Sequence, residues 1–465
     1  MAKLNKPRPS LRTHERAVAK RITPEQQLRR SLMSCMLWEK QFYEDGEDIA
    51  RRIERIIPEV KPQRVADIAD EARNKMHLRH APLLVARAMA KIGSHKPLLA
   101  NTLSRIIQRP DELTEFLAIY WKDKKQPLSA QTKKGLAKAF QKFDEYQLAK
   151  YNRGDAIKLR DVLFLCHAKP KDKAQERMWK RLIDGNLKTP DTWEVALSAS
   201  STGAEKRQEW ERLLSEGKLG GLALLRNLRN FQRVNVNENL IINGINRMNT
   251  SRILPFRFIA AARYAPHLEQ YLENAMFKCL KGKERLQGHT VLLVDVSGSM
   301  TSSISSKSDM TRQDAAIGLA ILLRELCQRV DIVTFSNNVV RVAPRRGFAL
   351  RDAINTSQPS GGTYLGNAIK VVYERGTFTL NTWGWGIHNN RIQGFGLRPD
   401  RLIVITDEQS HDRVQDPLGR GYMINVASYK NGVGYGPWVH IDGFSEAIVD
   451  YLKEYEVFEK DIMGW

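Results

Sequence analysis

The stretch V-L-L-V-D-V-S-G-S-M, from Val291 to Met300, decides how the last third of the chain folds. Its four consecutive apolar residues predict a strand that is buried on both faces, as in a parallel sheet. The oxygen donors that follow at alternate positions, Asp295, Ser297 and Ser299, can converge on one hard metal ion where the strand gives way to a loop. Gly298 is expected to allow a tight bend there. The alternative is an ordinary strand-to-helix turn in which the serines cap the next helix.

Two later segments favour the metal interpretation. Gly361-Gly362-Thr363 places a hydroxyl after two glycines, and Arg401 to Asp407, R-L-I-V-I-T-D, is a second apolar strand that ends in an acid. Asp-x-Ser-x-Ser, then Thr, then Asp, in this order, resembles the metal-ion-dependent adhesion site of von Willebrand factor A domains, over roughly residues 290–465. The resemblance implies that Thr363 and Asp407 complete the ligand set.

The same resemblance implies a cofactor and a kind of partner. The cofactor is Mg²⁺ or Mn²⁺, which prefers few carboxylates and retained waters. Because two carboxylates alone bind such an ion weakly, the site is expected to be empty without added metal. A protein partner, such as a nuclease, would supply an acidic residue as a further ligand.

Strand and helix patterns alternate after residue 290, which indicates an α/β doubly wound sheet. In such sheets ligands bind beyond the carboxyl ends of the strands, where Asp295 and Asp407 fall. The segment 377–399 is rich in glycine and aromatic residues, and it is predicted to be a long loop near the metal face. We expect Trp383 and Trp385 to pack on the domain rather than to stack on bases.

The positive charge of the chain belongs to its first part. Residues 1–290 hold 56 Lys and Arg against 33 Asp and Glu, whereas residues 291–465 hold 18 against 19. A single-sign field of this size favours a polyanion, most simply nucleic acid. The alternatives are a solubility surface or a host whose proteins are generally basic, but the neutral second part of the same chain argues against them.

From residue 24 to about residue 280 the apolar spacing is helical almost throughout, as in 82–92 and 98–107. Many short helices without a heptad repeat predict an all-α, HEAT-like stack of helix pairs. The expected domains are therefore a basic flexible arm (1–23), a helical-repeat region (24–280), a charged linker (281–289) and the α/β domain (290–465).

Three segments of the helical region have a recognisable pattern. They are Asp161 to Pro170 (D-V-L-F-L-C-H-A-K-P), Leu222 to Asn230 (L-A-L-L-R-N-L-R-N) and Ser251 to Phe258 (S-R-I-L-P-F-R-F). Together they resemble the TROVE module of the Ro autoantigen family, and their place before an A-type domain strengthens the match. The resemblance implies a multidomain protein: a HEAT-like helical-repeat ring, closed by the von Willebrand factor A-like domain.

Small noncoding Y RNAs are the implied partners, bound on the outer basic surface of the ring. Single-stranded ends of defective RNAs would enter its central hole, in RNA quality control or a ribonucleoprotein scaffold. The resemblance places His167 and Lys150 against RNA. It also has a basic residue four positions after that lysine, where this chain has Gly154 with Arg153 adjacent.

Other basic residues near these segments are candidates on chemical grounds. The helix up to Cys166 is expected to end because of Pro170, which leaves His167 and Lys169 at a helix end. A lone histidine is otherwise more often a structural residue. Two pairs could hold phosphates, although a solvated face is the other interpretation: Arg226 and Arg229, and Arg252 and Arg257.

Several classes of protein are disfavoured. The four cysteines are widely spaced, which indicates reduced thiols in a cytoplasmic protein. No apolar run reaches the length of a membrane span, and no P-loop or nucleophile elbow suggests an enzyme. We therefore expect a monomeric, non-catalytic RNA-binding protein. The alternative is a metal-dependent protein-interaction module whose helical part is only a scaffold.

Overall fold

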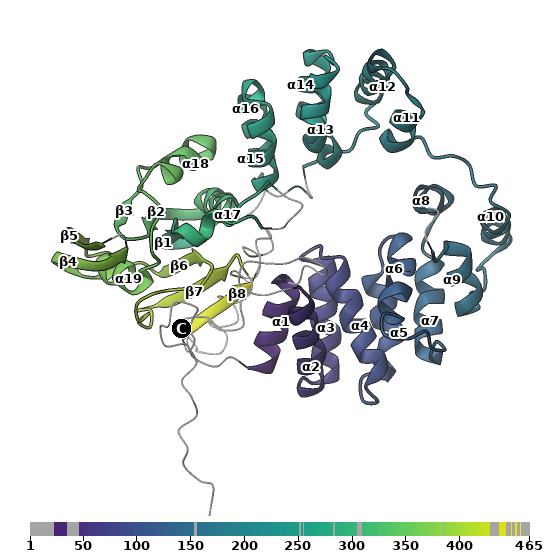
Figure 1. The fold of residues 1–465 in the computed structure, drawn as a ribbon, viewed down its shortest axis with the longest axis horizontal. Coiled ribbons are helices and arrows are strands. Elements are labelled where there is room, and N and C mark those ends of the chain that lie inside the picture. The colour runs from purple at the N-terminus through teal and green to yellow at the C-terminus, as the bar shows by residue number, and fades with distance from the viewer. Residues whose placement is uncertain are drawn as a thin grey trace, which may run out of the picture. The chain divides into compact units, whose positions relative to one another are not determined.

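The computed structural model describes residues 23–34, 46–152, 156–250, 253, 255–281, 284–304, 309–384, 386–427 and 437–442, together with 448, 452 and 456. The chain divides into two compact units (Figure 1). The helical unit holds the first described helix and Gly46–Leu219, and the mixed unit holds Gly220–Trp465. The sequence predicted a change of domain at 281–289, whereas the compact units divide before Gly220.

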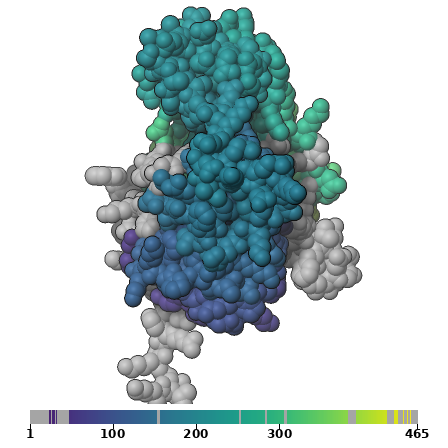
Figure 2. Space-filling view, turned by 90° about the vertical axis from the view of Figure 1, so that its right-hand side faces the viewer, coloured from purple at the N-terminus to yellow at the C-terminus, as the bar shows by residue number. Residues whose placement is uncertain are grey.

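Stacked helices make up the helical unit, as the apolar spacing predicted. Its helices are α1 (Pro24–Ser34), α2 (Gly46–Ile56), η1 (Ile57–Glu59), α3 (Pro62–Asn74), α4 (His80–Lys91), α5 (Lys96–Ile106), α6 (Asp111–Tyr120), α7 (Ala130–Phe140), α8 (Glu145–Tyr151), α9 (Leu159–Cys166), α10 (Lys173–Asp184), α11 (Trp193–Ala199) and α12 (Gly203–Ser215). Helices α3, α5, α7 and α9 pack side by side in one layer, and α2, α4 and α6 in a second. In the space-filling view the helices of this unit, in blue, form one continuous surface (Figure 2).

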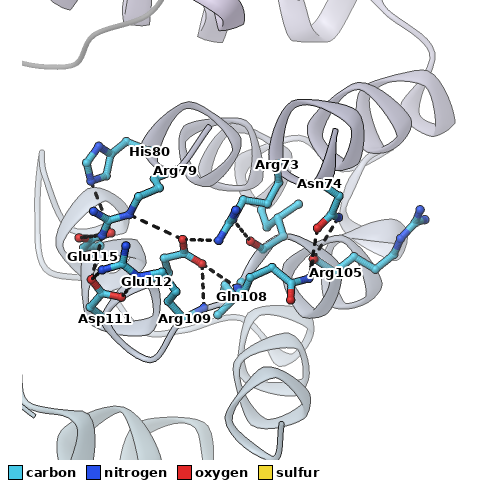
Figure 3. A network of polar contacts seen from close by, with 12 residues as sticks. Arg73, Asn74, Arg79, His80, Arg105, Gln108, Arg109, Asp111, Glu112 and Glu115 are labelled. Carbon is cyan, nitrogen blue, oxygen red and sulfur yellow. Dashed lines mark hydrogen bonds and ion pairs between the residues drawn. The ribbon is translucent and has the colours of Figure 1, made fainter. Parts of the chain in front are cut away.

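A buried ion pair ties three of these helices together (Figure 3). Arg73 on α3 donates from Nη2 to Glu112 Oε1 on α6 at 2.7 Å, and from Nε to the carbonyl of Ile106 at the end of α5 at 3.0 Å. The other oxygen of Glu112 accepts from the backbone N–H of Gln108 at 2.6 Å and of Arg109 at 3.0 Å. Glu112 is fully buried, and this burial is the main cause that raises its pKa. One carboxylate therefore fixes the relative positions of α3, α5 and α6.

The mixed unit begins with four helices and continues into a sheet. Its helices are α13 (Gly221–Arg233), α14 (Glu238–Arg247), α15 (Pro255–Tyr264), η2 (Pro266–Leu268), α16 (Glu269–Lys278), η3 (Gly298–Thr301), α17 (Arg312–Leu326), α18 (Gly347–Asn355) and α19 (Leu365–Tyr373). Its main strands are β1 (Leu286–Asp295), β2 (Cys327–Phe335), β3 (Val339–Arg341), β6 (Arg401–Thr406), β7 (Arg420–Asn425) and β8 (Trp438–Asp442). The sheet order is β3-β2-β1-β6-β7-β8, and only the edge strand β3 is antiparallel to its neighbour. The predicted α/β sheet is confirmed.

Close packing joins the helices of this unit to its sheet. Gly318 of α17 lies against Phe256 of α15, so closely that a Cβ on Gly318 would stand 3.0 Å from the Phe256 Cβ and 3.2 Å from its backbone N. Helix α16 in turn packs on α18. The four helices before the sheet therefore share a core with it, which accounts for a division before Gly220.

The segment 377–399 was wrongly predicted to be a loop. It contains most of a β-hairpin, formed by β4 (Arg375–Gly384) and β5 (Gly386–Phe395) as an antiparallel pair. Phe378 lies opposite Ile392, and both pack on the apolar core beside α19. In β4 the alternating apolar residues Phe378 and Leu380 belong to this core or pack on it, and they anchor the hairpin although it contains several glycines. Trp385 and the side chain of Trp383 lie outside the described part, so their packing stays a prediction.

Candidate functional site

The two acids of the metal motif lie at the ends of adjacent strands. Asp295 is the last residue of β1, and Asp407 follows β6 directly. The strands pair in parallel, with Val294 opposite Ile405, so both acids stand at the same edge of the sheet. Both side chains are fully buried.

Contacts between loops bring the hydroxyl residues to this edge. The N–H of Gly298 donates to the carbonyl of Gly361 at 2.8 Å, which ties the loop after β1 to the loop before α19. The Oγ atoms of Ser297 and Ser299 are 3.4 Å apart, and Thr363 is only 4% exposed. The structure therefore places Asp295, Ser297, Ser299 and Asp407 at one edge of the sheet, and it ties the loop that leads to Thr363 to the loop after β1.

The electrostatics of the two acids fit a cation. Burial, and then the charge of Asp407, raise the pKa of Asp295 to about 7. Asp295 accepts hydrogen bonds from the backbone N–H of Ser297 at 2.9 Å and from Thr406 Oγ1 at 2.6 Å, which hold its carboxylate in place. Two buried carboxylates among hydroxyl oxygens form a hard donor set of the kind that Mg²⁺ and Mn²⁺ prefer.

An arginine that the sequence analysis did not select also lies at this edge. Arg312, at the start of α17, is 4% exposed, and its Nη1 stands 3.2 Å from Asp407 Oδ2 and 3.4 Å from the carbonyl of Ser299. It places a fixed positive charge beside one of the two acids. No spacing rule could have identified it, because Arg312 and Asp407 are 95 positions apart in the chain.

The glycines of the motif act differently from the prediction. A Cβ on Gly298 would meet nothing closer than the Gly361 carbonyl at 3.5 Å, so the bend does not require glycine there. At Gly361 a Cβ would lie 2.5 Å from Asn337 Nδ2. Asn337 Oδ1 accepts a hydrogen bond from the N–H of Gly362 at 2.7 Å. The Asn337 side chain therefore lies so close to the backbone before Thr363 that only glycine leaves room for it.

In the helical unit, His167 stands in an unusual backbone conformation. It follows α9 with φ 52° and ψ 43°, a left-handed conformation in which glycine is the usual residue. The N–H of Ala168 donates to Leu163 O at 3.3 Å, and the N–H of His167 to Phe164 O at 3.2 Å, which is a Schellman motif. The helix therefore ends by this motif at Cys166, before Pro170 could end it. The His167 side chain is exposed, as predicted.

A lysine that the sequence analysis did not select is the basic neighbour of His167. Lys133 Nζ of α7 lies 3.4 Å from His167 Nε2. Lys169 is exposed, and its carbonyl accepts from Gln141 Nε2 at 2.8 Å. Lys150 lies at the end of α8 with its Nζ 5.9 Å from the centre of the Tyr151 ring. Arg153 lies outside the described residues, so its contact with RNA stays a prediction.

In the mixed unit, two predicted arginines lie on helices that pack together, α13 and α15. The pKa of Arg257 on α15 is lowered by its burial and then by the charge of Arg226 on α13. Among the described residues, neither arginine has an ion pair with a carboxylate. Arg229 lies over the ring of Tyr264, with its Cζ 5.7 Å from the ring centre. Arg252 lies outside the part of the chain that the structure describes.

Comparison with family models finds two domains. Residues 173–309 match the TROVE domain, and residues 290–409 match the von Willebrand factor type A domain. The second match includes all five residues of the metal motif, whereas His167 lies before the first. None of the helices that the structure describes is long and apolar enough to cross a membrane.

Two known proteins are similar to this chain. The crystal structure of the Ro (RSR) protein of Deinococcus radiodurans matches 92% of this chain and 98% of its own, with a TM-score of 0.60 and 18% identity. Telomerase protein component 1 of Mus musculus is 34% identical over 94 residues, which are 19% of this chain and 4% of that protein. The chain thus spans a very small part of that relative's length.

Proposed function

Since the chain belongs to the Ro family, with a TROVE domain followed by a von Willebrand factor type A domain, we propose that it binds RNA and is not an enzyme. The observation that carries this proposal is the placement of Arg226 and Arg257 on the packed helices α13 and α15, where the charge of Arg226 contributes to lowering the pKa of Arg257. Arg226 is exposed and Arg257 is half-buried, so water only partly screens the repulsion between their like charges. A phosphate between the two guanidinium groups would relieve the repulsion and accept their hydrogen bonds.

A contrast within the chain supports this assignment. Two well-buried arginines elsewhere hold carboxylates: Arg73 holds Glu112, and Arg401 holds Glu456. Arg226 is exposed and Arg257 is half-buried, and neither has such a partner among the described residues. Both lie within the residues that match the TROVE domain. A polyanion is therefore the partner that its charge fits best.

The finer proposal assigns different RNAs to different surfaces. Small structured RNA of the Y type binds the helical unit through Lys150, His167 and Lys169, to which the structure adds Lys133. Single-stranded ends bind at Arg226, Arg229 and Arg257. Shape and unpaired bases select the RNA, because the deep groove of an A-form duplex is closed to side chains. These contacts suit a role in RNA quality control or as a scaffold.

The experiment uses the double variant Arg226→Gln/Arg257→Gln of the full chain with a single-stranded RNA oligonucleotide. The affinity should fall, and the slope of log K against log salt should flatten by about 0.7 for each phosphate that the variant no longer neutralises. The control is Arg51→Gln/Arg207→Gln, which removes the same charge from arginines that are 72% and 50% exposed and paired with carboxylates. Equal effects of the two variants would show that only net charge matters, and would overturn the assignment.

A second candidate function rests on the buried pair of acids. We propose that Asp295, Ser297, Ser299, Thr363 and Asp407 hold Mg²⁺ or Mn²⁺ at the sheet edge. When bound, the ion would supply a coordination position for an acidic residue of a protein partner. The chain's own residues orient the donors through the bond from Thr406 to Asp295, and Arg312 balances part of the charge of Asp407.

A further inference from the structure

Helix α9 presents an aromatic ring to solvent between basic groups. Phe164 is 57% exposed, and it is the only exposed phenylalanine among the residues that the structure describes. Burying such a side chain would contribute about 1.5–3 kcal/mol, and nothing in the described part of the chain covers it. A single exposed apolar residue is normal on a protein surface, so the inference depends on an ordered arrangement of charged groups around the ring.

The surroundings of Phe164 have such an arrangement. Arg160 and Phe164 lie at positions i and i+4 and form one exposed stripe along α9. His167 follows the last turn of the helix in its left-handed conformation, and it is exposed too. The opposite face of the helix is buried through Leu159, Val162 and Cys166, which fixes the direction of the stripe. Lys133 adds a second cation at the His167 end, 3.4 Å from the imidazole.

The stripe and its basic neighbour Lys133 carry positive charge. Within the described residues, neither Arg160 nor Lys133 has an ion pair with a carboxylate, although many surface arginines of this unit do. A flat apolar ring between cations matches a nucleobase between its phosphates, because every base has a face that stacks and a backbone that carries negative charge. An apolar protein surface would not need the cations.

We infer that Phe164 is a stacking platform for an unpaired base of a bound RNA, with Arg160, His167 and Lys133 contacting the adjacent phosphates. This inference rests on the proposed RNA binding. It adds to the proposed contacts with phosphates a site that recognises unpaired bases. Single-stranded loops and bulges offer such bases, whereas a perfect duplex does not.

The test compares Phe164→Ala and Phe164→Trp in the full chain, with two RNA probes: a hairpin with an unpaired loop, and a blunt duplex of the same composition. Phe164→Ala should bind the hairpin roughly 5- to 150-fold more weakly, which is the range of about 1–3 kcal/mol for one stacked base. Its salt slope should be unchanged, because no charge is removed. Phe164→Trp should bind as wild type does, and its added fluorescence should be quenched by the hairpin and not by the duplex.

The matched controls separate the possible outcomes. Tyr146→Ala removes another aromatic side chain of this unit, 51% exposed on α8, and it should leave hairpin binding unchanged. If Lys133→Gln weakens RNA binding and Phe164→Ala does not, the basic surface is real and the stacking inference is wrong. If neither weakens it, RNA binding by this part of the helical unit fails as well. Self-association that Phe164→Ala abolishes, with RNA binding intact, would make the ring a protein contact and overturn the inference.

Discussion

At His167 the backbone and the side chain favour different residues. A left-handed conformation costs an L-residue about 1–2 kcal/mol, although histidine tolerates it better than most residues do. Glycine would remove this cost, and the Schellman motif itself makes no use of the imidazole. The exposed imidazole next to Lys133 is therefore the feature that the histidine adds.

We predict that His167→Gly stabilises the fold and weakens RNA binding. The variant gains about 1–2 kcal/mol because glycine adopts the left-handed conformation without strain. It loses about 0.5–1 kcal/mol because glycine is more flexible in the unfolded chain. The free energy of unfolding should therefore rise by roughly 0.5–1 kcal/mol. Urea denaturation measures this change, and binding to a structured RNA measures the weaker affinity. His77→Gly is the control, because His77 also has a positive φ, of 55°, and it is not one of the proposed RNA contacts. A His167→Gly protein that binds RNA normally would show that the imidazole has no part in binding.

Single residues were predictable from the sequence where their chemistry is local. The acids and hydroxyls of the metal motif belong to short segments, and the structure places both acids at one sheet edge with the loops that carry the hydroxyls tied to each other. Lys133 and Arg312 were missed because their contacts are distant in the sequence. Lys133 lies beside His167, 34 positions away, and Arg312 beside Asp407, 95 positions away. Phe164 could have been found, since its place four positions after Arg160 and three before His167 is visible in the chain.

Elements were predictable where one period dominates. The helices of the helical unit and the apolar strands β1 and β6 follow from spacing alone. The hairpin of β4 and β5 was missed because glycines interrupt a short alternation, and its anchoring by Phe378 and Ile392 depends on α19. The position of α3 relative to α6 could not be predicted either, because it depends on an ion pair between residues 39 positions apart.

We predict that Glu112→Ala destabilises the helical unit by about 3–5 kcal/mol, because it leaves the charge of Arg73 buried without a partner. The side chains of Arg73 and Glu112 are 10% and 0% exposed. The control is Glu47→Ala, which breaks a pair with Arg51 that is 72% and 49% exposed and should cost about 0–1 kcal/mol. Urea denaturation followed by far-ultraviolet circular dichroism measures both. Similar destabilisation of the two variants would mean that Arg73 finds another partner or reaches water.

The two parts of the sequence differ in charge, and this difference organises the functions of the whole molecule. The excess of Lys and Arg lies before residue 291, while the residues after it are nearly neutral. We therefore assign the proposed RNA binding, with its counterion release, to the helices and the proposed metal binding to the sheet edge. Within the mixed unit the two functions share α17, whose Gly318 packs on α15 and whose Arg312 contacts Asp407.

We predict that Asp295→Ala abolishes binding of Mn²⁺ and leaves RNA affinity and its salt slope unchanged. The variant removes one of two carboxylates from the donor set, and it removes no cation from the surfaces proposed for RNA. Titration with Mn²⁺, followed by electron paramagnetic resonance, measures the first effect, and RNA binding with and without a chelator measures the second. Asp295→Asn, which keeps the size of the side chain, controls for local packing around Thr406. If both variants fold normally but no longer bind RNA, the contact of α17 with α15 couples the metal edge to Arg257. Wild-type Mn²⁺ binding in both would show that these acids do not form the metal site.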